Sequence, residues 1–74
     1  MLQDTYKRLL VSLGSFEGLA RRTKPMDFKD SRLLGELHSL IKIRAQAAIN
    51  AGYPQTFITH AFNITWGYRR YLAL

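Results

Sequence analysis

The chain has 74 residues, 47% of them hydrophobic and 22% charged, and its 11 Lys and Arg residues against five Asp and Glu residues give a formal net charge of +6. A chain of this length holds one hydrophobic core, so a multidomain enzyme is excluded. The absence of cysteine excludes a disulfide framework and a thiolate metal site, so stability must come from helix packing or from a second copy of the chain.

The sequence also bears on location. Its longest apolar run falls far short of the roughly 18 residues that span a bilayer, and Met1–Asp4 lacks a basic region followed by an apolar stretch. We therefore expect a soluble, cytoplasmic protein that makes no membrane contact.

A first helix is expected over about residues 2–22. Gly14 and Gly18 each cost about 1 kcal/mol relative to alanine, and Ser15 could cap a second short helix, so the sequence allows a kink or a break near Gly14. The following segment, 23–29, contains Pro25 and mixed charges without periodicity, which predicts a loop. Apolar residues of the first helix recur at steps of four and three and form one stripe: Leu2, Tyr6, Leu9, Leu13, Phe16 and Ala20.

A second helix is expected over about residues 31–51, with Asp30 or Ser31 as its N-cap. We expect Gly52 to adopt the left-handed conformation after the last turn and Pro54 to prevent the helix from continuing. Because the helix is apolar on two faces, it is predicted to be the most buried of the domain. One face carries Leu34, Leu37, Ile41, Ala45 and Ala48, and the other carries Leu33, Leu40, Ile43 and Ala47.

Two interpretations fit residues 54–72. A four-three spacing of Phe57, Ala61, Ile64, Tyr68 and Tyr71 favours one continuous helix. Weak helix formers favour a break at 62–64, with Asn63 in a left-handed turn and Thr65 capping a final helix. In either case residues 1–74 form a single all-α domain of three to four helices, which we expect to be a dimer.

The segment from Gln55 to Leu72 reads Gln-Thr-Phe-Ile-Thr-His-Ala-Phe-Asn-Ile-Thr-Trp-Gly-Tyr-Arg-Arg-Tyr-Leu. It resembles the helix-turn-helix segment of phage repressors and Fis-type nucleoid proteins. The resemblance implies that Thr59 faces the partner helix, that 62–64 form the turn and that Leu72 returns to the core. It differs from the family in having Asn63 where a turn glycine is usual, and Arg69 near a position commonly filled by an inward aliphatic side chain. By resemblance, the recognition helix would carry Thr65, Trp66, Gly67, Arg69 and Arg70.

All five carboxylates lie within the first 36 residues, so the second half of the chain carries uncompensated positive charge. This pattern fits an anionic partner and equally fits a basic surface that keeps the protein in solution. The leading hypothesis is a small, homodimeric, DNA-binding transcriptional regulator of the kind that phages, plasmids and bacteria encode. The alternative is a protein-binding module, such as a phage-encoded inhibitor, that docks on a larger host protein through its aromatic and arginine-rich C-terminal segment. The candidate contact residues are Lys42, Arg44, Thr65, Trp66, Tyr68, Arg69 and Arg70.

The sequence offers no convergent catalytic set, so we expect no enzymatic activity. Glu36 lies two residues from His38, a spacing that separates their side chains on a helix, and His38 is therefore expected to be solvated or at the edge of the core. His60 has no carboxylate close in sequence. Metal-ligand spacings and glycine-rich phosphate loops are absent, so neither a metal nor a cofactor is expected.

Overall fold

A computed structural model describes residues 3–74 of the chain, and it confirms the predicted small all-α domain. No strand occurs among these residues. Four α-helices and one turn of 3₁₀ helix follow one another: α1 (Asp4–Arg21), η1 (Pro25–Asp27), α2 (Arg32–Asn50), α3 (Gln55–Ile64) and α4 (Trp66–Leu72).

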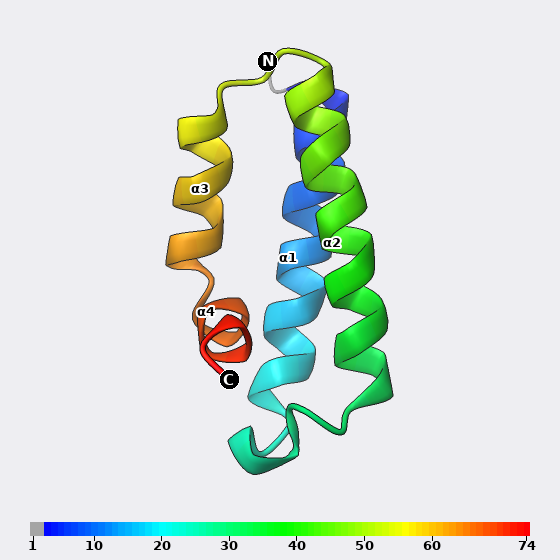
Figure 1. The fold of residues 1–74 in the computed structure, drawn as a ribbon, viewed down its shortest axis with the longest axis vertical. Helices are drawn as coiled ribbons and strands as arrows, with labels where there is room; N and C mark the ends of the chain where they lie inside the picture. The colour runs from blue at the N-terminus through cyan, green and yellow to red at the C-terminus, as the bar shows by residue number, and fades with distance from the viewer. Residues whose placement is uncertain (1–2) are drawn as a thin grey trace.

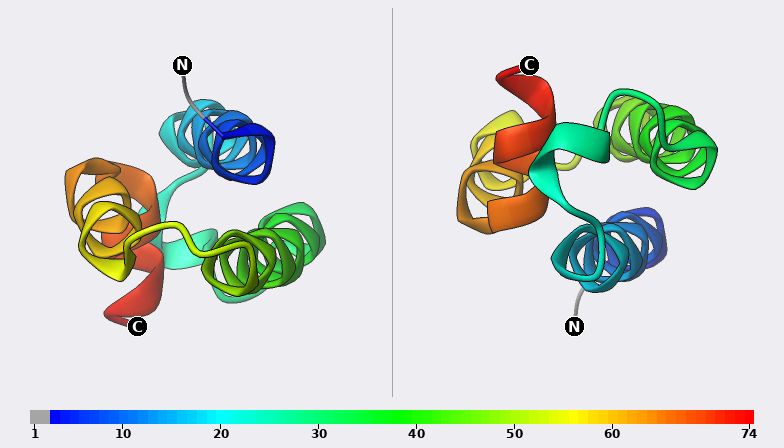
Figure 2. Two further views of the ribbon diagram at one scale, coloured as in Figure 1. Left: turned by 90° about the horizontal axis from the view of Figure 1, so that it is seen from above. Right: turned by 90° about the horizontal axis from the view of Figure 1, so that it is seen from below.

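The three longer helices run along the long axis of a body measuring 36 × 19 × 19 Å (Figure 1). Seen along that axis, they occupy the corners of a triangle (Figure 2). Helix α4 leaves the direction of α3 steeply and is viewed nearly end on in Figure 1. Helix α1 packs against α2, α3 and α4, so it is the central element of the fold.

Helix α1 is continuous through Gly14, so the kink or break that the sequence allowed there does not occur. The described part of the predicted apolar stripe is buried on both sides of Gly14, from Tyr6 to Ala20, and Leu2 lies outside the described residues. Packing of this long stripe on a single core outweighs the cost of about 1 kcal/mol that a glycine brings to a helix.

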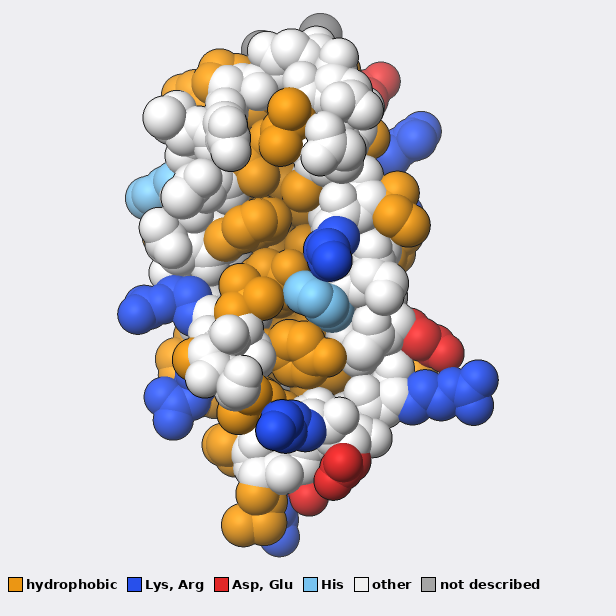
Figure 3. Space-filling model, in the orientation of Figure 1, with side chains coloured by type: hydrophobic (Ala, Val, Ile, Leu, Met, Phe, Trp, Pro, Cys, Tyr) orange, Lys and Arg blue, Asp and Glu red, His pale blue; other side chains and the backbone are white. Residues whose placement is uncertain are grey.

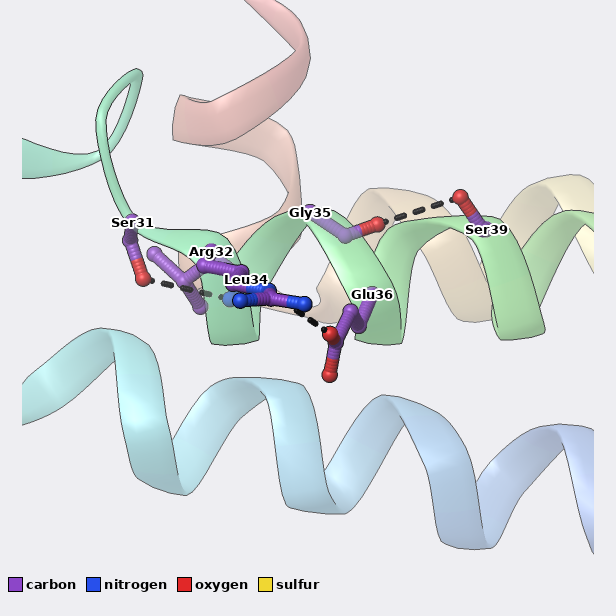
Figure 4. A network of polar contacts seen from close by, with 6 residues as sticks. All are labelled: Ser31, Arg32, Leu34, Gly35, Glu36 and Ser39. Carbon is purple, nitrogen blue, oxygen red and sulfur yellow. Dashed lines mark hydrogen bonds and ion pairs between the residues drawn. The ribbon is translucent and has the colours of Figure 1, made fainter.

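The predicted loop after α1 contains the 3₁₀ turn η1, and the next residue, Phe28, is fully buried. Ser31, one of the two predicted N-cap residues, caps helix α2. Its hydroxyl accepts a hydrogen bond from the Leu34 N–H at 3.2 Å. Figure 4 shows this cap and the exposed Arg32–Glu36 ion pair, whose N–O distance is 3.3 Å, in the first turns of α2.

Only one of the two apolar faces of α2 enters the core. Leu34, Ile41, Ala45 and Ala48 are buried. The second face lies mostly in solvent, since Leu33 is 59% exposed, Ile43 is 67% exposed and Leu40 is half-buried. The prediction that α2 is the most buried helix is wrong, since α1 buries six residues and α2 four. A single small core can meet only one side of a helix, and the expected dimer stays a prediction.

The chain turns between α2 and α3 at Gly52, which adopts the predicted left-handed conformation with φ of 89°. The next break comes at Thr65, whose extended backbone (φ −92°, ψ 99°) separates α3 from α4. Asn63 lies inside α3, and no residue other than glycine has positive φ in the described chain, so the predicted left-handed turn at Asn63 is wrong. Thr65 stands at the N-cap of α4, but its hydroxyl donates to the Ala61 carbonyl at 2.8 Å and does not cap that helix.

The break at Thr65 changes which side chains face inward. One continuous helix would place Phe57 and Ile64 on the same apolar stripe as Ala61 and Tyr68. Phe57 and Ile64 are instead both exposed. Thr59 and Leu72 are also exposed, whereas the resemblance implied that they face a partner helix and the core. On the face seen in Figure 3, hydrophobic side chains form a band down the molecule. Tyr53, Phe62 and Tyr71 pack against the core and are only half-buried.

Candidate functional site

Helix α4 is fixed to α1 by an unusually close approach at Gly67. The backbone N–H of Gly67 donates to the Glu17 carboxylate at 2.6 Å. A Cβ atom at position 67 would lie 2.5 Å from the Cβ of Ala20, so only glycine fits there without a shift of the helices. One α1 carboxylate therefore satisfies an N-terminal N–H of α4 and complements the positive end of its dipole.

Tyr68 anchors α4 in the core and is only 2% exposed, so it does not lie on the surface with the other candidate contact residues. Its ring packs edge-on against Phe16 at a centroid distance of 5.2 Å. Its hydroxyl oxygen lies 3.1 Å from His38 Nδ1. Burial raises the pKa of Tyr68, with a further contribution from Tyr71.

His38 occupies the predicted position at the edge of the core, half-buried on α2 and hydrogen-bonded to Tyr68. Burial lowers the pKa of His38, and the positive charge of Lys42 lowers it further. This hydrogen bond links α2 to α4, so His38 has a structural role.

The opposite side of α4 is exposed and carries the remaining α4 candidates. The Arg21 guanidinium carbon lies 5.0 Å from the centroid of the Trp66 ring, and that of Arg70 lies 5.3 Å from it. Trp66 is 37% exposed, and Arg69 is exposed beside it. We call these four residues, Arg21, Trp66, Arg69 and Arg70, the arginine–tryptophan surface.

The sequence did not indicate Arg21 as part of this surface. It ends α1, whereas Trp66 begins α4, and the fold alone brings them together. The Nε of Arg21 also donates to the Glu17 carboxylate at 2.5 Å. Glu17 therefore positions both the start of α4 and one of the two guanidinium groups over Trp66.

Three other predicted contact residues are not part of the arginine–tryptophan surface. Lys42 is exposed on α2, next to the half-buried His38. Arg44 crosses from α2 to α1, where its Nη1 donates to the Ser12 hydroxyl at 2.6 Å and to the Arg8 carbonyl at 3.1 Å. Thr65 is half-buried in a hollow between α1 and α3. The structure thus divides the predicted contact set: Thr65 lies beside the start of α4, whereas Lys42 and Arg44 lie in the middle of α2.

The local geometry differs from what the helix-turn-helix resemblance implied. A single residue, Thr65, connects α3 to an α4 of seven residues. Recognition helices present their N-terminal residues to base edges, but Gly67 and Tyr68 are buried here and Glu17 occupies the N-terminal N–H of Gly67.

Residues 37–74 contain no Asp or Glu, but the fold brings acidic side chains of the first half of the chain next to them. Glu17 lies against α4, and acidic and basic side chains lie near one another on the lower right of the face in Figure 3. Within residues 3–74, no cluster of three or more His, Asp or Glu side chains could hold a metal ion. Over the same residues, no helix combines the length and apolar character needed to cross a bilayer.

Comparisons of this chain with models of protein families, with curated proteins and with solved structures found no match.

Proposed function

We propose that the protein is a non-enzymatic protein-binding module that docks on an acidic segment of a larger protein through the arginine–tryptophan surface. The observation that carries this proposal is the exposed Trp66 ring with the guanidinium groups of both Arg21 and Arg70 within cation–π distance of it. Trp and Arg are the residue types most enriched among those that dominate the energy of protein interfaces.

The chemistry of the surface suits carboxylates. Within residues 3–74, Arg21 uses only its Nε in a hydrogen bond, and Arg69 and Arg70 use no side-chain donor. Free guanidinium forks bind carboxylates through paired, charge-assisted hydrogen bonds. An acidic segment with one apolar side chain over Trp66 would engage both kinds of contact.

DNA binding through α4 has less support from the geometry. The Glu17 carboxylate stands at the N-terminus of α4, where a phosphate or a base edge would have to approach. The buried Gly67 and Tyr68 leave Trp66 as the only exposed residue in the first three positions of α4. Arg69 and Arg70 could still contact phosphates, so DNA is the competing outcome of the test.

The test uses Trp66, the single tryptophan of the chain, as a fluorescent reporter at the surface itself. A displayed library of 16-residue peptides is selected on the wild-type protein, and the enriched peptides are titrated while Trp66 emission is recorded. The same titration is run with a 20-base-pair duplex over a series of salt concentrations.

We expect the enriched peptides to be acidic with an apolar residue, to shift Trp66 emission and to lose binding to the R69A/R70A variant. Arg32→Ala is the matched control, because Arg32 is also an exposed arginine in a helix but belongs to α2, where it pairs with Glu36. Peptides that bind R69A/R70A equally would overturn the proposal. Duplex binding that weakens steeply with salt and is lost in R69A/R70A would establish the DNA-binding alternative.

A further inference from the structure

A second basic and apolar surface lies between α1 and α2, outside the arginine–tryptophan surface. It is a hollow of about 490 Å³ on the outer side of the α1–α2 pair. Two branched aliphatic side chains border it in solvent, Val11 at 66% exposure and Ile43 at 67%. The hollow is lined by Thr5, Lys7, Arg8, Val11, Ile43, Arg44 and Ala47.

The charge of this hollow is one-sided. Three of its lining residues, Lys7, Arg8 and Arg44, are cationic, and none is acidic. Arg44 is held in place by its two hydrogen bonds to α1, to the Ser12 hydroxyl and the Arg8 carbonyl. These bonds use one of its terminal nitrogens, so the other donors of a guanidinium already fixed in orientation are free to receive a carboxylate.

We infer that the α1–α2 hollow is a docking groove for an acidic, amphipathic helix of another protein, with an aliphatic side chain seated between Val11 and Ile43. A groove between two packed helices is a common seat for an amphipathic helix. Charge complementarity selects an acidic helix, because its carboxylates would meet Lys7, Arg8 and Arg44 while its apolar anchor covers the two exposed aliphatic residues.

A second copy of this chain suits the groove less well. In a two-fold symmetric pair the same patch faces itself, so the three cations of one copy would meet the three cations of the other. Such like-charge contacts oppose association.

This groove is independent of the proposed function at α4. It is built from the first half of α1, whereas Arg21 of the arginine–tryptophan surface is the last residue of that helix. Loss of binding at one surface should therefore leave binding at the other intact, and variants at the two surfaces can be told apart.

The test uses a designed probe, a fluorescein-labelled 18-residue peptide. Its leucines are spaced alternately three and four residues apart, so that they form one face of a helix, and the other positions are glutamate. Its binding is followed by polarisation, and the methyl signals of Val11 and Ile43 are followed by NMR. Ile43→Glu removes an aliphatic border residue and repels the probe. The matched control is Leu33→Glu, which makes the same kind of change at an exposed aliphatic residue of α2 that does not line the hollow.

We expect the probe to shift both methyl signals, with affinity reduced at least about tenfold by Ile43→Glu and changed less than about twofold by Leu33→Glu. Both positions are exposed, so circular dichroism should report an unchanged fold for both variants. Unmoved Val11 and Ile43 signals at millimolar probe, or equal weakening by both variants, would overturn the inference. Probe binding that is lost only in R69A/R70A would also overturn it, because the probe would then bind the arginine–tryptophan surface. Concentration-dependent dimers that Ile43→Glu dissociates would assign the groove to a second copy of the chain. Methyl shifts with anionic phospholipid vesicles but not with the peptide would assign it to a lipid surface.

Discussion

The carboxylate of Glu17, four residues before the end of α1, accepts a 2.6 Å hydrogen bond from the backbone N–H of Gly67, fifty residues further along the chain. This bond satisfies an N–H that α4 cannot satisfy internally, because the first turn of a helix lacks carbonyl partners. It also places a negative charge at the positive end of α4. This contact therefore helps to hold Trp66, Arg69 and Arg70 of α4 beside Arg21 of α1.

Removing the carboxylate should loosen α4. We predict that Glu17→Ala lowers the free energy of unfolding by about 1–3 kcal/mol, because a partly buried N–H loses its charged acceptor. Urea denaturation followed by circular dichroism measures this change. Glu36→Gln is the control, since Glu36 makes only an exposed ion pair with Arg32, and it should change the free energy by less than about 0.5 kcal/mol. Equal effects of the two substitutions would contradict the capping role.

Two glycines should respond to alanine with opposite signs. Gly67→Ala places a Cβ 2.5 Å from that of Ala20, so we expect a loss of about 1–3 kcal/mol from overpacking. Gly14→Ala meets no atom within 4 Å and should gain about 0.5–1 kcal/mol from helix propensity. Thermal and urea unfolding measure both changes. Adding Ala20→Gly should restore part of the stability lost in Gly67→Ala, and a stabilised Gly67→Ala variant would mean that α4 lies further from α1.

A substitution at Asn63 tests whether this residue is helical or adopts a left-handed turn. Because Asn63 lies inside α3, we predict that Asn63→Gly lowers the free energy of unfolding by about a few tenths of a kcal/mol, the difference in helix propensity between the two residues. A left-handed turn at this position would give the opposite sign, since glycine adopts it without strain. Chemical denaturation of the two proteins side by side decides between these outcomes.

The burial of His38 and Tyr68 predicts a dependence of stability on pH. The pKa of His38 is lowered in the folded protein, so the unfolded chain binds a proton first as pH falls. His38 therefore contributes stability that is fully present above its unfolded pKa, about 6.5, and that is lost as pH falls through its folded pKa. The raised pKa of Tyr68 acts at the other end, where stability should fall as pH rises above the unfolded tyrosine value of about 10.

Urea unfolding at intervals between pH 5 and pH 8 measures the His38 contribution. His38→Leu should flatten the change in stability across this range, whereas substitution of the exposed His60 by alanine should leave it in place. Persistence of the same pH dependence in His38→Leu would assign it to another group.

The exposed arginines of α4 should matter for binding and little for folding. Among side-chain hydrogen bonds, ion pairs and cation–π contacts of residues 3–74, R69A/R70A loses the contact of Arg70 with Trp66, an exposed pair that stabilises by about 0.5–1 kcal/mol. We therefore expect a small decrease in melting temperature and a full loss of binding at the arginine–tryptophan surface. Calorimetry of the free protein gives the first quantity, and a variant that unfolds would show that these arginines are structural.

Local patterns in the sequence determined the helices and several of their ends. The stripe from Tyr6 to Ala20 predicted the buried face of α1, and the serine at position 31 and the glycine at position 52 predicted a cap and a turn. These features depend on residues within a few positions of one another, where helix geometry and backbone sterics act directly. Arg69 and Arg70, named from the sequence as candidate contact residues, are exposed, as expected of two adjacent guanidinium groups that are costly to bury.

Only the tertiary structure decided which faces meet and where the last helix begins. Periodicity groups side chains on one face of a helix, but it does not say which of two apolar faces of α2 joins the core or that Tyr68 turns inward. Three contacts join α1 to α4, which are far apart in the chain: Gly67 with Ala20, Gly67 with Glu17, and Trp66 with Arg21. Such contacts follow from close packing between helices, which no local spacing of residues encodes.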